Sequence, residues 1–284
     1  MNYFPRGFER LVEPFAGSAA VSLAAASSRR ASSFLLNDVN GPLMALWDRI
    51  LTAPKELMQA YAELWSDQLG DERRFYDQVR TDFNNDRDPA RFLYLLARCV
   101  KASVRYNAYG EFNQSSDNRR KGAQPGTMAW HVLGASELLR ERTETLSKDY
   151  REVFQLVRPS DLVYMDPPYQ GVCVTRAPRY IESVQFRDFV AGLESLNARA
   201  ISYLVSYDGH LGDKSCGEPL PDHLELRCIE VHVGRSSQAT LLGRNDDTCE
   251  TLYLSPALCS RLDIPVPERV SLRVGQADLF AEVR

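Results

Sequence analysis

Short runs of apolar residues alternate along the chain with stretches in which apolar residues recur every three or four positions. The short runs predict strands, and they fall at 10–17, 33–37, 161–165, 200–206, 224–233 and 251–254. The recurring spacing predicts helices through most of 42–104 and over 186–199. Strands that alternate with helices predict a largely parallel sheet, and the last two strands, which no helix separates, predict an antiparallel edge.

The pattern also predicts how the chain is divided. A run of alanines follows Gly17 and favours a helix, so a strand, a tight loop and a helix follow one another near the N-terminus. The stretch 106–126 is rich in glycine, asparagine and arginine, and it predicts a loop or hairpin that projects from the core. We therefore expect an α/β protein in which 1–53 and 147–284 form the core domain and 54–146 is an inserted, mostly helical region.

Composition narrows the classes of function. The 284 residues are 44% hydrophobic and 25% charged, as in an ordinary globular protein that buries one substantial core. The net charge of -4 excludes a protein coated with positive charge, so any contact with nucleic acid needs a local patch. Such a patch lies between Arg98 and Lys121, where six basic residues stand against two acidic ones.

Neither a metal site nor a membrane location is expected. The six cysteines form no C-x-x-C pair and the four histidines lack ligand spacing, which indicates no zinc site and no disulfide framework. The sequence has no run of about 18 apolar residues, and its N-terminus lacks the pattern of a secretion signal. We therefore expect a cytoplasmic protein.

Candidate chemistry follows the apolar run 161–165, in the sequence Asp166-Pro167-Pro168-Tyr169. Ligands of open α/β sheets bind at the carboxyl ends of strands. An amino group on an aromatic base is a poor nucleophile because its lone pair is delocalised into the ring. The Asp166 carboxylate and the Pro167 carbonyl would accept both amino hydrogens from fixed directions, since proline restricts the backbone, and Tyr169 would stack on the base. A plain turn after a buried strand is the alternative for these residues.

A second candidate site lies in the loop Phe15-Ala16-Gly17-Ser18. Glycine lets a ligand approach the backbone, and the N-terminus of the following helix offers N–H groups to a carboxylate. Asp38 ends the next predicted strand about 20 residues later, where an acid typically binds the ribose hydroxyls of a nucleotide. The loop has one glycine and no Gly-Lys-Ser/Thr sequence, so a nucleoside without phosphates fits it better than a nucleotide.

In their order along the chain, these motifs resemble those of the Dam-type (D12 class, alpha group) DNA adenine-N6 methyltransferases. The residues that carry the resemblance lie at 12–17, 37–40, 105–113, 148–150 and 164–169. The resemblance implies a Rossmann-like, S-adenosylmethionine-dependent methyltransferase core. This core would have a mixed seven-stranded sheet with an antiparallel edge strand, and the helical insert would be the target-recognition region. No metal is implied.

The resemblance also assigns roles to single residues. The methionine end of S-adenosylmethionine would be lined by Phe15, Ala16, Gly17 and Ser18, its ribose bound by Asp38, and its adenine by Asp149 and Tyr150. Asp166 would lie between the cofactor and the target amine, within the catalytic group Asp166, Pro167, Pro168 and Tyr169. Candidate DNA-binding residues combine basic groups for phosphates with polar and aromatic groups for bases: Arg105, Asn107, Tyr109, Asn113, Arg119, Arg120 and Lys121.

We therefore expect transfer of a methyl group to N6 of an adenine that is flipped out of double-stranded DNA. A restriction enzyme or a second methyltransferase subunit is a candidate partner, and a GATC site is implied by the family alone. Two alternatives stay open. The residues 1–9 do not match the Gly-Lys pair that the family has before its first strand, so the chain could be a DNA- or cofactor-binding subunit that needs a partner or an N-terminal extension. Motifs of the Pro-Pro-aromatic type also serve planar amines of RNA and of protein amides, although the basic, asparagine-rich insert favours DNA.

Overall fold

The strands and helices of the protein are distributed over two units. The computed structural model describes residues 3–100, 104–117, 119–168, 184–211, 214–216, 218–235, 247–266 and 269–273. Unit 1 consists of Met1–Val12, Phe154–Arg176 and Ser183–Arg284, and unit 2 consists of Glu13–Val153 and Ala177–Glu182. The folding of each unit determines which of the candidate residues come together within it.

Unit 1 is built on a mixed sheet. Its strands are β1 (Arg10–Glu13), β4 (Leu162–Met165), β5 (Ser202–Leu211), β6 (Lys214–Cys216), β7 (Arg227–Arg235), β8 (Asp247–Leu254) and β9 (Arg269–Arg273). The hydrogen-bonded order is β1-β4-β5-β8-β7-β9, and β6 pairs with β5. β4 runs parallel to both of its neighbours, with Val163 opposite Val12 on one side and Tyr203 on the other. The residues that follow β4 therefore lie at the carboxyl edge of three parallel strands.

Strand β8 gives the main order of this sheet its mixed character, and β6 also pairs with β5 in antiparallel. β8 runs antiparallel to both β5 and β7, whereas β9 pairs with β7 in parallel. The predicted mixed α/β architecture is confirmed, but the antiparallel strand lies inside the order rather than at its end. The difference arises after Pro256, where the chain forms α10 (Pro256–Leu262) and then adds β9 beside β7.

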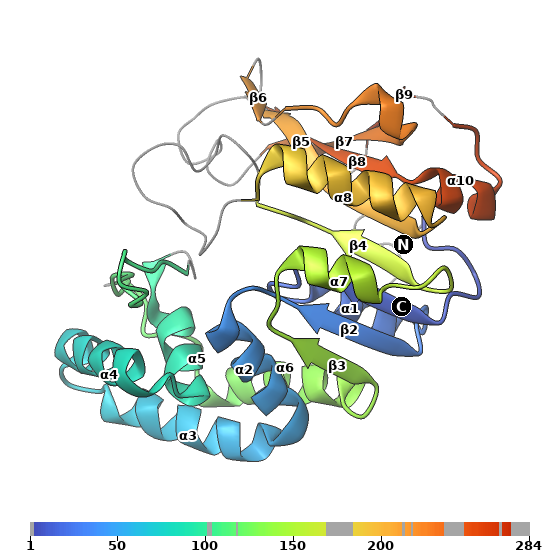
Figure 1. Cartoon of the computed structure of the whole chain (residues 1–284). Coiled ribbons are helices and arrows are strands. Elements are labelled where there is room, and N and C mark those ends of the chain that lie inside the picture. Colours follow the sequence, from blue (N-terminus) through green and yellow to red (C-terminus); the bar gives the residue numbers. More distant parts are fainter. Residues whose placement is uncertain are drawn as a thin grey trace. The chain divides into compact units, whose positions relative to one another are not determined.

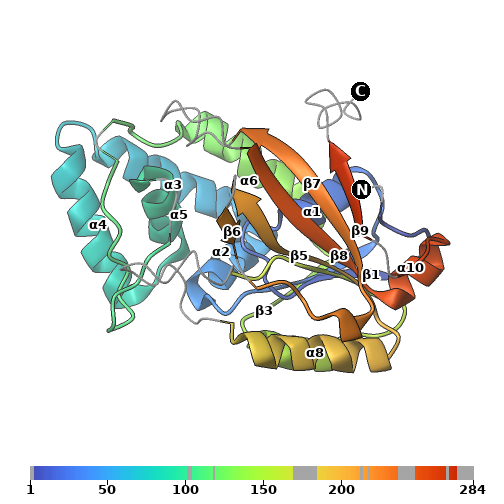
Figure 2. The same ribbon diagram turned by 90° about the horizontal axis from the view of Figure 1, so that it is seen from above.

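Helix α8 (Phe186–Ala198) lies along one face of the sheet of unit 1 (Figure 2). Its buried residues recur at helical spacing: Phe189, Val190, Leu193 and Leu196. The Phe189 ring stacks on Tyr207 of β5, with ring centroids 5.5 Å apart. Full burial of such a side chain stabilises a fold by about 1.5–3 kcal/mol. The helix predicted over 186–199 is confirmed.

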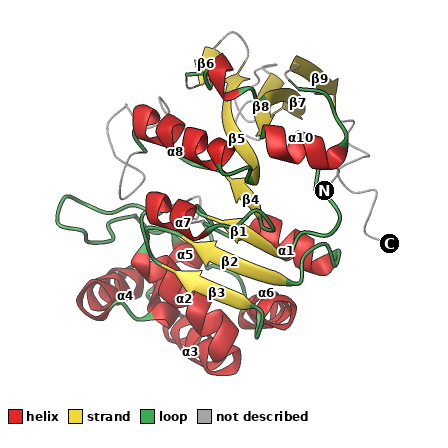
Figure 3. Ribbon diagram, turned by 45° about the vertical axis from the view of Figure 1, so that its right-hand side comes forward, coloured by secondary structure: helices red, strands yellow, loops and turns green. Residues whose placement is uncertain are grey.

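Unit 2 combines two parallel strands, β2 (Ser33–Asn37) and β3 (Thr143–Leu146), with a group of helices (Figure 1). The helices are α1 (Ala20–Ser27), α2 (Gly41–Thr52), α3 (Pro54–Asp67), α4 (Glu72–Asp86), α5 (Pro89–Arg98) and α6 (Pro125–Leu139). Helix α7 (Tyr150–Leu156) begins in unit 2 and ends in unit 1. α5 packs against α2, α3 and α4, and α6 packs against α1, α2 and α3 (Figure 3).

Aromatic side chains form the core of the α3–α5 bundle. Phe83 and Phe92 are completely buried and stacked, with ring centroids 5.1 Å apart, and Phe112 packs edge-on against both. Tyr61 and Tyr76 are also completely buried. The helical block predicted from 42 onward is confirmed as α2 to α5. Within the described part of the chain, no helix has the length and apolar character that a membrane span requires.

Candidate functional site

Backbone hydrogen bonds fix the loop between β1 and α1. The Ala16 N–H donates to the Asn37 carbonyl at the end of β2 (2.7 Å), and the Ala19 N–H donates to the Ala16 carbonyl (2.6 Å). Gly17 has a φ of 49°, and a Cβ atom added there would meet no described atom within 4 Å. This left-handed backbone explains the glycine, because other residues pay about 1–2 kcal/mol for it. The space beside Gly17 leaves the backbone open to a ligand.

The first turn of α1 is partly occupied by the protein itself. Glu13, the last residue of β1, is buried, and its Oε1 accepts a hydrogen bond from the Ser22 N–H (2.7 Å). Ser22 is the third residue of α1, and Ala19 at the N-cap position makes no side-chain cap. Glu13 thus supplies the cap that the N-cap residue lacks. The sequence predicted that this helix end offers its N–H groups to a ligand. For the Ser22 N–H this prediction is wrong, because Glu13 already binds it.

Asp38 lies directly after β2, and its carboxylate reaches the loop. The Gly17 N–H donates to Oδ2 (3.1 Å) and the Asn40 N–H donates to Oδ1 (2.9 Å). Burial raises the pKa of Asp38 above its usual range, and the two N–H donors oppose that rise. The structure therefore brings together the predicted glycine and the predicted acid, which are 21 residues apart in the sequence.

Asn37 organises this region, although the sequence analysis assigned it no role. Its side chain is completely buried, its Nδ2 donates to the carbonyls of Pro14 and Lys148 (2.9 Å each), and its Oδ1 accepts from the Lys148 N–H (2.9 Å). One side chain therefore ties the loop after β1, the end of β2 and the segment before α7. The signal in the sequence was an amide residue at the end of an apolar strand, where a buried polar group needs partners.

The rings of Phe15 and Tyr150 lie beside each other, with centroids 5.2 Å apart and planes inclined at 35°. The structure thus brings together two residues predicted for the two ends of the cofactor. Asp149 precedes α7 and caps it, since its Oδ1 accepts from the Arg151 N–H (2.8 Å). The same oxygen accepts from the Arg151 Nε (2.8 Å), and this hydrogen bond lowers the pKa of Asp149.

These groups fit an adenosine-containing ligand without phosphates. The Asp38 oxygens each keep a lone pair for a hydroxyl donor. Phe15 is half-buried and leaves part of its ring accessible to a planar base, whereas Tyr150 beside it is buried. No lysine or arginine occurs between Leu11 and Ser28 to balance a phosphate. Among the residues that the structure describes, no group of three or more His, Cys, Asp and Glu side chains is placed to hold a metal ion.

Asp166 lies in unit 1, immediately after β4. Its side chain is exposed, Pro167 is buried and Pro168 is half-buried. An acid is therefore presented to solvent at the carboxyl edge of three parallel strands, on a backbone that two prolines restrict. Tyr169, the fourth residue of the predicted catalytic group, lies outside the described residues.

The chain from 105 to 113 forms a hairpin within the stretch predicted as a loop or hairpin. The Asn107 N–H donates to the Glu111 carbonyl (2.9 Å), and the Asn107 Oδ1 accepts from the Tyr109 N–H (2.9 Å). Tyr109 at the tip is 89% exposed. The hairpin carries four of the predicted DNA-binding residues: Arg105, Asn107, Tyr109 and Asn113.

The other three predicted DNA-binding residues, Arg119, Arg120 and Lys121, are exposed on the segment that follows. Lys121 forms an ion pair with Glu72 of α4, with 2.8 Å between Nζ and Oε1. An exposed pair of this kind contributes about 0–1 kcal/mol, so Lys121 can exchange it for a phosphate at little cost. The segment thus presents consecutive positive charges.

Buried polar side chains of the helical bundle bind the backbone in and beside the basic segment at 119–121. The Gln68 Nε2 donates to the Lys121 carbonyl (3.0 Å), and the Gln68 Oε1 accepts from the Tyr94 hydroxyl (3.0 Å). The Tyr61 hydroxyl donates to the Ala123 carbonyl (2.6 Å), and the Arg98 Nη1 donates to the Asp117 carbonyl (3.3 Å). These groups act on the backbone of the segment, so they set its path and leave its basic side chains to solvent.

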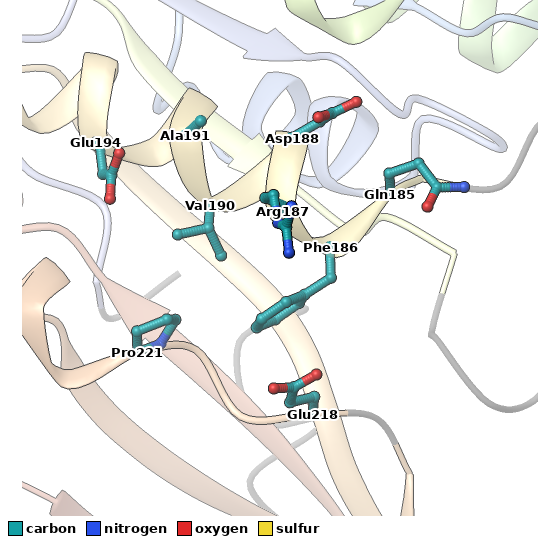
Figure 4. Close-up of a pocket in the computed structure, with 9 residues that line it drawn as sticks. All are labelled: Gln185, Phe186, Arg187, Asp188, Val190, Ala191, Glu194, Glu218 and Pro221. Atoms are coloured by element: carbon teal, nitrogen blue, oxygen red, sulfur yellow. The ribbon is translucent and has the colours of Figure 1, made fainter.

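A hollow of about 830 Å³ lies at the start of α8 (Figure 4). Phe186, Val190 and Glu194 line it from the helix, and Glu218 and Pro221 line it from the chain before β7. None of the residues predicted for cofactor, catalysis or DNA belongs to its lining. The charged residues that line this hollow include both acidic and basic side chains, and they do not gather around one point. No ligand is therefore assigned to it.

One family of proteins matches most of the chain. The model of the family described as "D12 class N6 adenine-specific DNA methyltransferase" matches residues 1–225. The chain is 30% identical over 178 residues to a DNA adenine methylase of Salmonella typhi, and this alignment covers 61% of this chain and 60% of that protein. The same figures hold for the DNA adenine methylase of Escherichia coli K12.

An archaeal protein gives a longer alignment. The chain is 27% identical over 225 residues to the type II methyltransferase M.MjaIII of Methanocaldococcus jannaschii, with 72% of this chain and 77% of that protein covered. The bacterial DNA adenine methylases named above are matched over 60% of their own length. The matched part of the chain includes the loop after β1, the hairpin and Asp166.

Proposed function

The chain belongs to the D12 class N6 adenine-specific DNA methyltransferases, and we propose that it transfers a methyl group from S-adenosylmethionine to the N6 amino group of an adenine in duplex DNA. The observation that carries the proposal is the exposed Asp166 carboxylate at the carboxyl edge of β1, β4 and β5, followed by the buried Pro167. An acceptor pair with fixed directions is what a weakly nucleophilic aromatic amine requires.

Unit 2 supplies the residues proposed to bind the cofactor. Asp38 would accept hydrogen bonds from the ribose hydroxyls, because its carboxylate is already held at the loop by the Gly17 and Asn40 N–H groups. Phe15 and Tyr150 would contact the cofactor through their rings. Ala16, Gly17 and Ser18 would line the methionine end, and Asp149 would lie near the adenine while it caps α7.

Catalysis would depend on how Asp166 and Pro167 hold the target amine. S-adenosylmethionine supplies a methyl group bound to a positively charged sulfur. The Asp166 carboxylate and the Pro167 carbonyl would each accept one hydrogen of the amino group, which draws its lone pair out of the ring and directs it away from the acceptors. Asp166 would also stabilise the positive charge that develops on the nitrogen as the bond from the methyl carbon to nitrogen forms and its bond to sulfur breaks. The nitrogen would then lose one hydrogen as a proton, through the Asp166 carboxylate to solvent, and S-adenosylhomocysteine would remain. Pro168 would restrict the backbone, and Tyr169 would stack on the base.

The hairpin and the basic segment are proposed to bind DNA. Arg105, which is half-buried at the base of the hairpin, would add a positive charge to this surface. Exposed Tyr109, together with Asn107 and Asn113, would face the bases, and Arg119, Arg120 and Lys121 would contact phosphates. We accordingly propose that 54–146 is the DNA-recognition region and that 1–53 and 147–284 form the catalytic domain.

The test is methyl transfer by Asp166 variants. Asp166→Ala and Asp166→Asn are expected to abolish the transfer of labelled methyl groups from S-adenosylmethionine to duplex DNA, because each removes the carboxylate and Asn also places a donor where an acceptor is needed. Asp222→Asn removes another exposed carboxylate of unit 1 and should retain wild-type activity. Undiminished transfer by both Asp166 variants would refute the assigned role.

The substrate is tested with the wild-type protein. Duplex DNA, single-stranded DNA, RNA and a glutamine-containing peptide are offered under the same conditions, and the labelled base is identified after digestion. N6-methyladenine from duplex DNA is the expected product. Label in RNA or peptide with none in DNA would replace the proposed substrate by one of the alternatives.

A further inference from the structure

A side chain of the DNA hairpin is hydrogen-bonded to the segment that carries the cofactor acid. The Tyr106 hydroxyl donates to the Oδ1 of Asn40 (3.0 Å). Asn40 is 7% exposed and Tyr106 is half-buried. Burial raises the pKa of Tyr106 to about 12, so the hydroxyl keeps its proton at neutral pH and acts as the donor.

Asn40 makes this bond at the expense of an ordinary capping bond. It occupies the N-cap position of α2, where asparagine is favoured because its side-chain oxygen accepts from a first-turn N–H. Here the side chain makes no such bond, and Pro42 in the first turn has no N–H to offer. The side-chain oxygen is directed to Tyr106 instead. Its position is thus determined by the hairpin and not by the helix that it begins.

From Asn40 the hydrogen bonds continue to the cofactor loop, which is the loop at 15–18 between β1 and α1. The Asn40 N–H donates to Asp38 Oδ1 (2.9 Å), and Asp38 Oδ2 accepts from the Gly17 N–H (3.1 Å). The Gly17 carbonyl in turn accepts from the Trp47 Nε1 (3.0 Å). Three consecutive hydrogen bonds therefore connect the hairpin to the glycine of the cofactor loop, all of them within unit 2.

The hairpin can transmit a displacement because its base is rigid. Tyr106 and Phe112 face each other in an antiparallel bridge, and their rings pack edge-on with centroids 6.0 Å apart. The Asn84 side chain binds the Phe112 backbone from both sides, accepting from its N–H (2.8 Å) and donating to its carbonyl (3.1 Å). DNA that engages the exposed tip therefore acts on a stiff element, and Tyr106 is the hairpin side chain bonded to Asn40.

We propose that Tyr106 is a positioning residue that couples DNA binding at the hairpin to cofactor binding at Asp38, through its hydrogen bond to Asn40. The inference rests on the proposed function, since it assumes that Asp38 binds the cofactor and that the hairpin binds DNA. The coupling is reciprocal: each ligand raises the affinity of the other by the same factor. Tyr106 itself touches neither ligand.

The experiment measures that factor. The dissociation constant of S-adenosylhomocysteine, which has no methyl group to transfer, is determined by calorimetry with and without a DNA duplex that the wild-type protein methylates. Their ratio is the coupling factor. Tyr106→Phe removes the hydroxyl alone and is expected to reduce this factor by about 2- to 10-fold, the effect of losing one hydrogen bond. Asn40→Ala removes the acceptor and should give the same reduction, with no further loss when the two changes are combined.

A matched control is available in unit 1. The Tyr203 hydroxyl donates to the Asn197 Oδ1 (2.9 Å), so Tyr203→Phe removes the same kind of hydrogen bond within unit 1. It should lower stability to a similar extent and leave the coupling factor at its wild-type value. A purely structural role for Tyr106 would make the two variants behave alike.

The possible results separate a failure of the inference from a failure of the proposed function. The inference is overturned if the wild-type factor is one, if Tyr106→Phe leaves it unchanged, or if Tyr203→Phe lowers it equally. In these cases methylation of DNA by the wild-type protein would show that the proposed function stands. A wild-type protein that binds no S-adenosylhomocysteine and methylates no DNA would instead overturn the proposed function, and the inference with it.

Discussion

Replacement of Asn37 by alanine is expected to loosen the cofactor loop. The buried amide makes three hydrogen bonds to backbone groups, two of them to Lys148 and one to Pro14. Alanine fills none of these positions, and the site is closed to water because Asn37 is 0% exposed. The loop after β1 therefore loses its fastening to the segment that precedes α7.

The expected loss of stability follows from the number of bonds. A typical hydrogen bond contributes about 0.5–1.5 kcal/mol net, and more when its loss leaves a buried group unpaired. Three such bonds give a decrease of roughly 2–4 kcal/mol in the free energy of unfolding. At about 2–4 °C per kcal/mol for a chain of this size, Tm should fall by roughly 4–16 °C. Affinity for the cofactor should fall at least about tenfold, because the loop must then be ordered on binding.

Tryptophan fluorescence reports selectively on the affected unit. The chain has three tryptophans, Trp47, Trp65 and Trp130, and all lie in the range Glu13–Val153 of unit 2. Trp47 is buried and donates to the Gly17 carbonyl (3.0 Å), so its emission also senses the loop. Urea titrations followed by fluorescence give the stability of unit 2, and calorimetry with S-adenosylhomocysteine gives the affinity.

Asn197→Ala is the matched control. Its amide donates to the Leu224 carbonyl (2.9 Å) and accepts from the Tyr203 hydroxyl (2.9 Å), both within unit 1. This variant should lose stability and keep its cofactor affinity. The reasoning fails if folded Asn37→Ala binds S-adenosylhomocysteine within twofold of the wild-type protein, or if Asn197→Ala loses as much affinity.

Three further predictions concern the charges and the buried polar groups of unit 2. Because burial raises the pKa of Asp38, its carboxylate should be protonated at a higher pH than an ordinary aspartate, so cofactor affinity should fall on acidification earlier than usual. The stability of the folded protein changes with pH in the opposite direction to cofactor affinity. The stabilisation that Asp38 contributes is present at low pH and is lost as the pH rises through the folded-state pKa. Calorimetric titration with the cofactor at several pH values checks the predicted loss of affinity. A wild-type affinity that varies with pH as little as that of Asp38→Asn would contradict the prediction. Arg119→Ala and Arg120→Ala should each weaken DNA binding for all sequences and reduce the slope of log K against log salt by about one; an unchanged slope would exclude a phosphate contact. Gln68→Leu leaves the Lys121 carbonyl and the Tyr94 hydroxyl without their partner, so unit 2 should lose about 1–3 kcal/mol. Trypsin should then cleave the basic segment faster, and wild-type cleavage kinetics would count against the support by Gln68.

The elements that the sequence predicted well are those whose apolar residues follow a clear pattern. The strand at 33–37 was recognised as a short continuous apolar run, and the helix at 186–199 because its buried residues recur at helical spacing. β3 was missed because its sequence, Thr-Glu-Thr-Leu, is half-exposed and pairs only with β2 in unit 2. α6 was missed because apolar residues occur around its circumference: Val132 is buried while Trp130 and Leu133 are exposed.

The candidate site was predictable where chemistry and spacing coincide. Gly17 and Asp38 each follow the end of a strand, β1 and β2, and the fold brings them within hydrogen-bonding distance. Asn37 was not predictable as a fastener, because two of its three bonds go to Lys148, which is 111 residues away in the sequence. The same holds for the bond from Tyr106 to Asn40, which are 66 residues apart. No local pattern specifies such contacts, since they depend on how distant segments pack.

These long-range bonds explain why the loop after β1 needs few polar side chains of its own to be ordered. Glu13 caps α1, Asn37 binds the Pro14 carbonyl, Asp38 binds the Gly17 N–H and Trp47 binds the Gly17 carbonyl. Each contact fixes the loop backbone from outside, so the loop residues themselves stay small and leave room for a ligand. A loop ordered in this way has less entropy to lose on binding, so part of the affinity for the proposed cofactor would reside in buried residues that do not touch it. Substitutions of the buried supports should accordingly weaken binding as strongly as substitutions of the residues that line the loop.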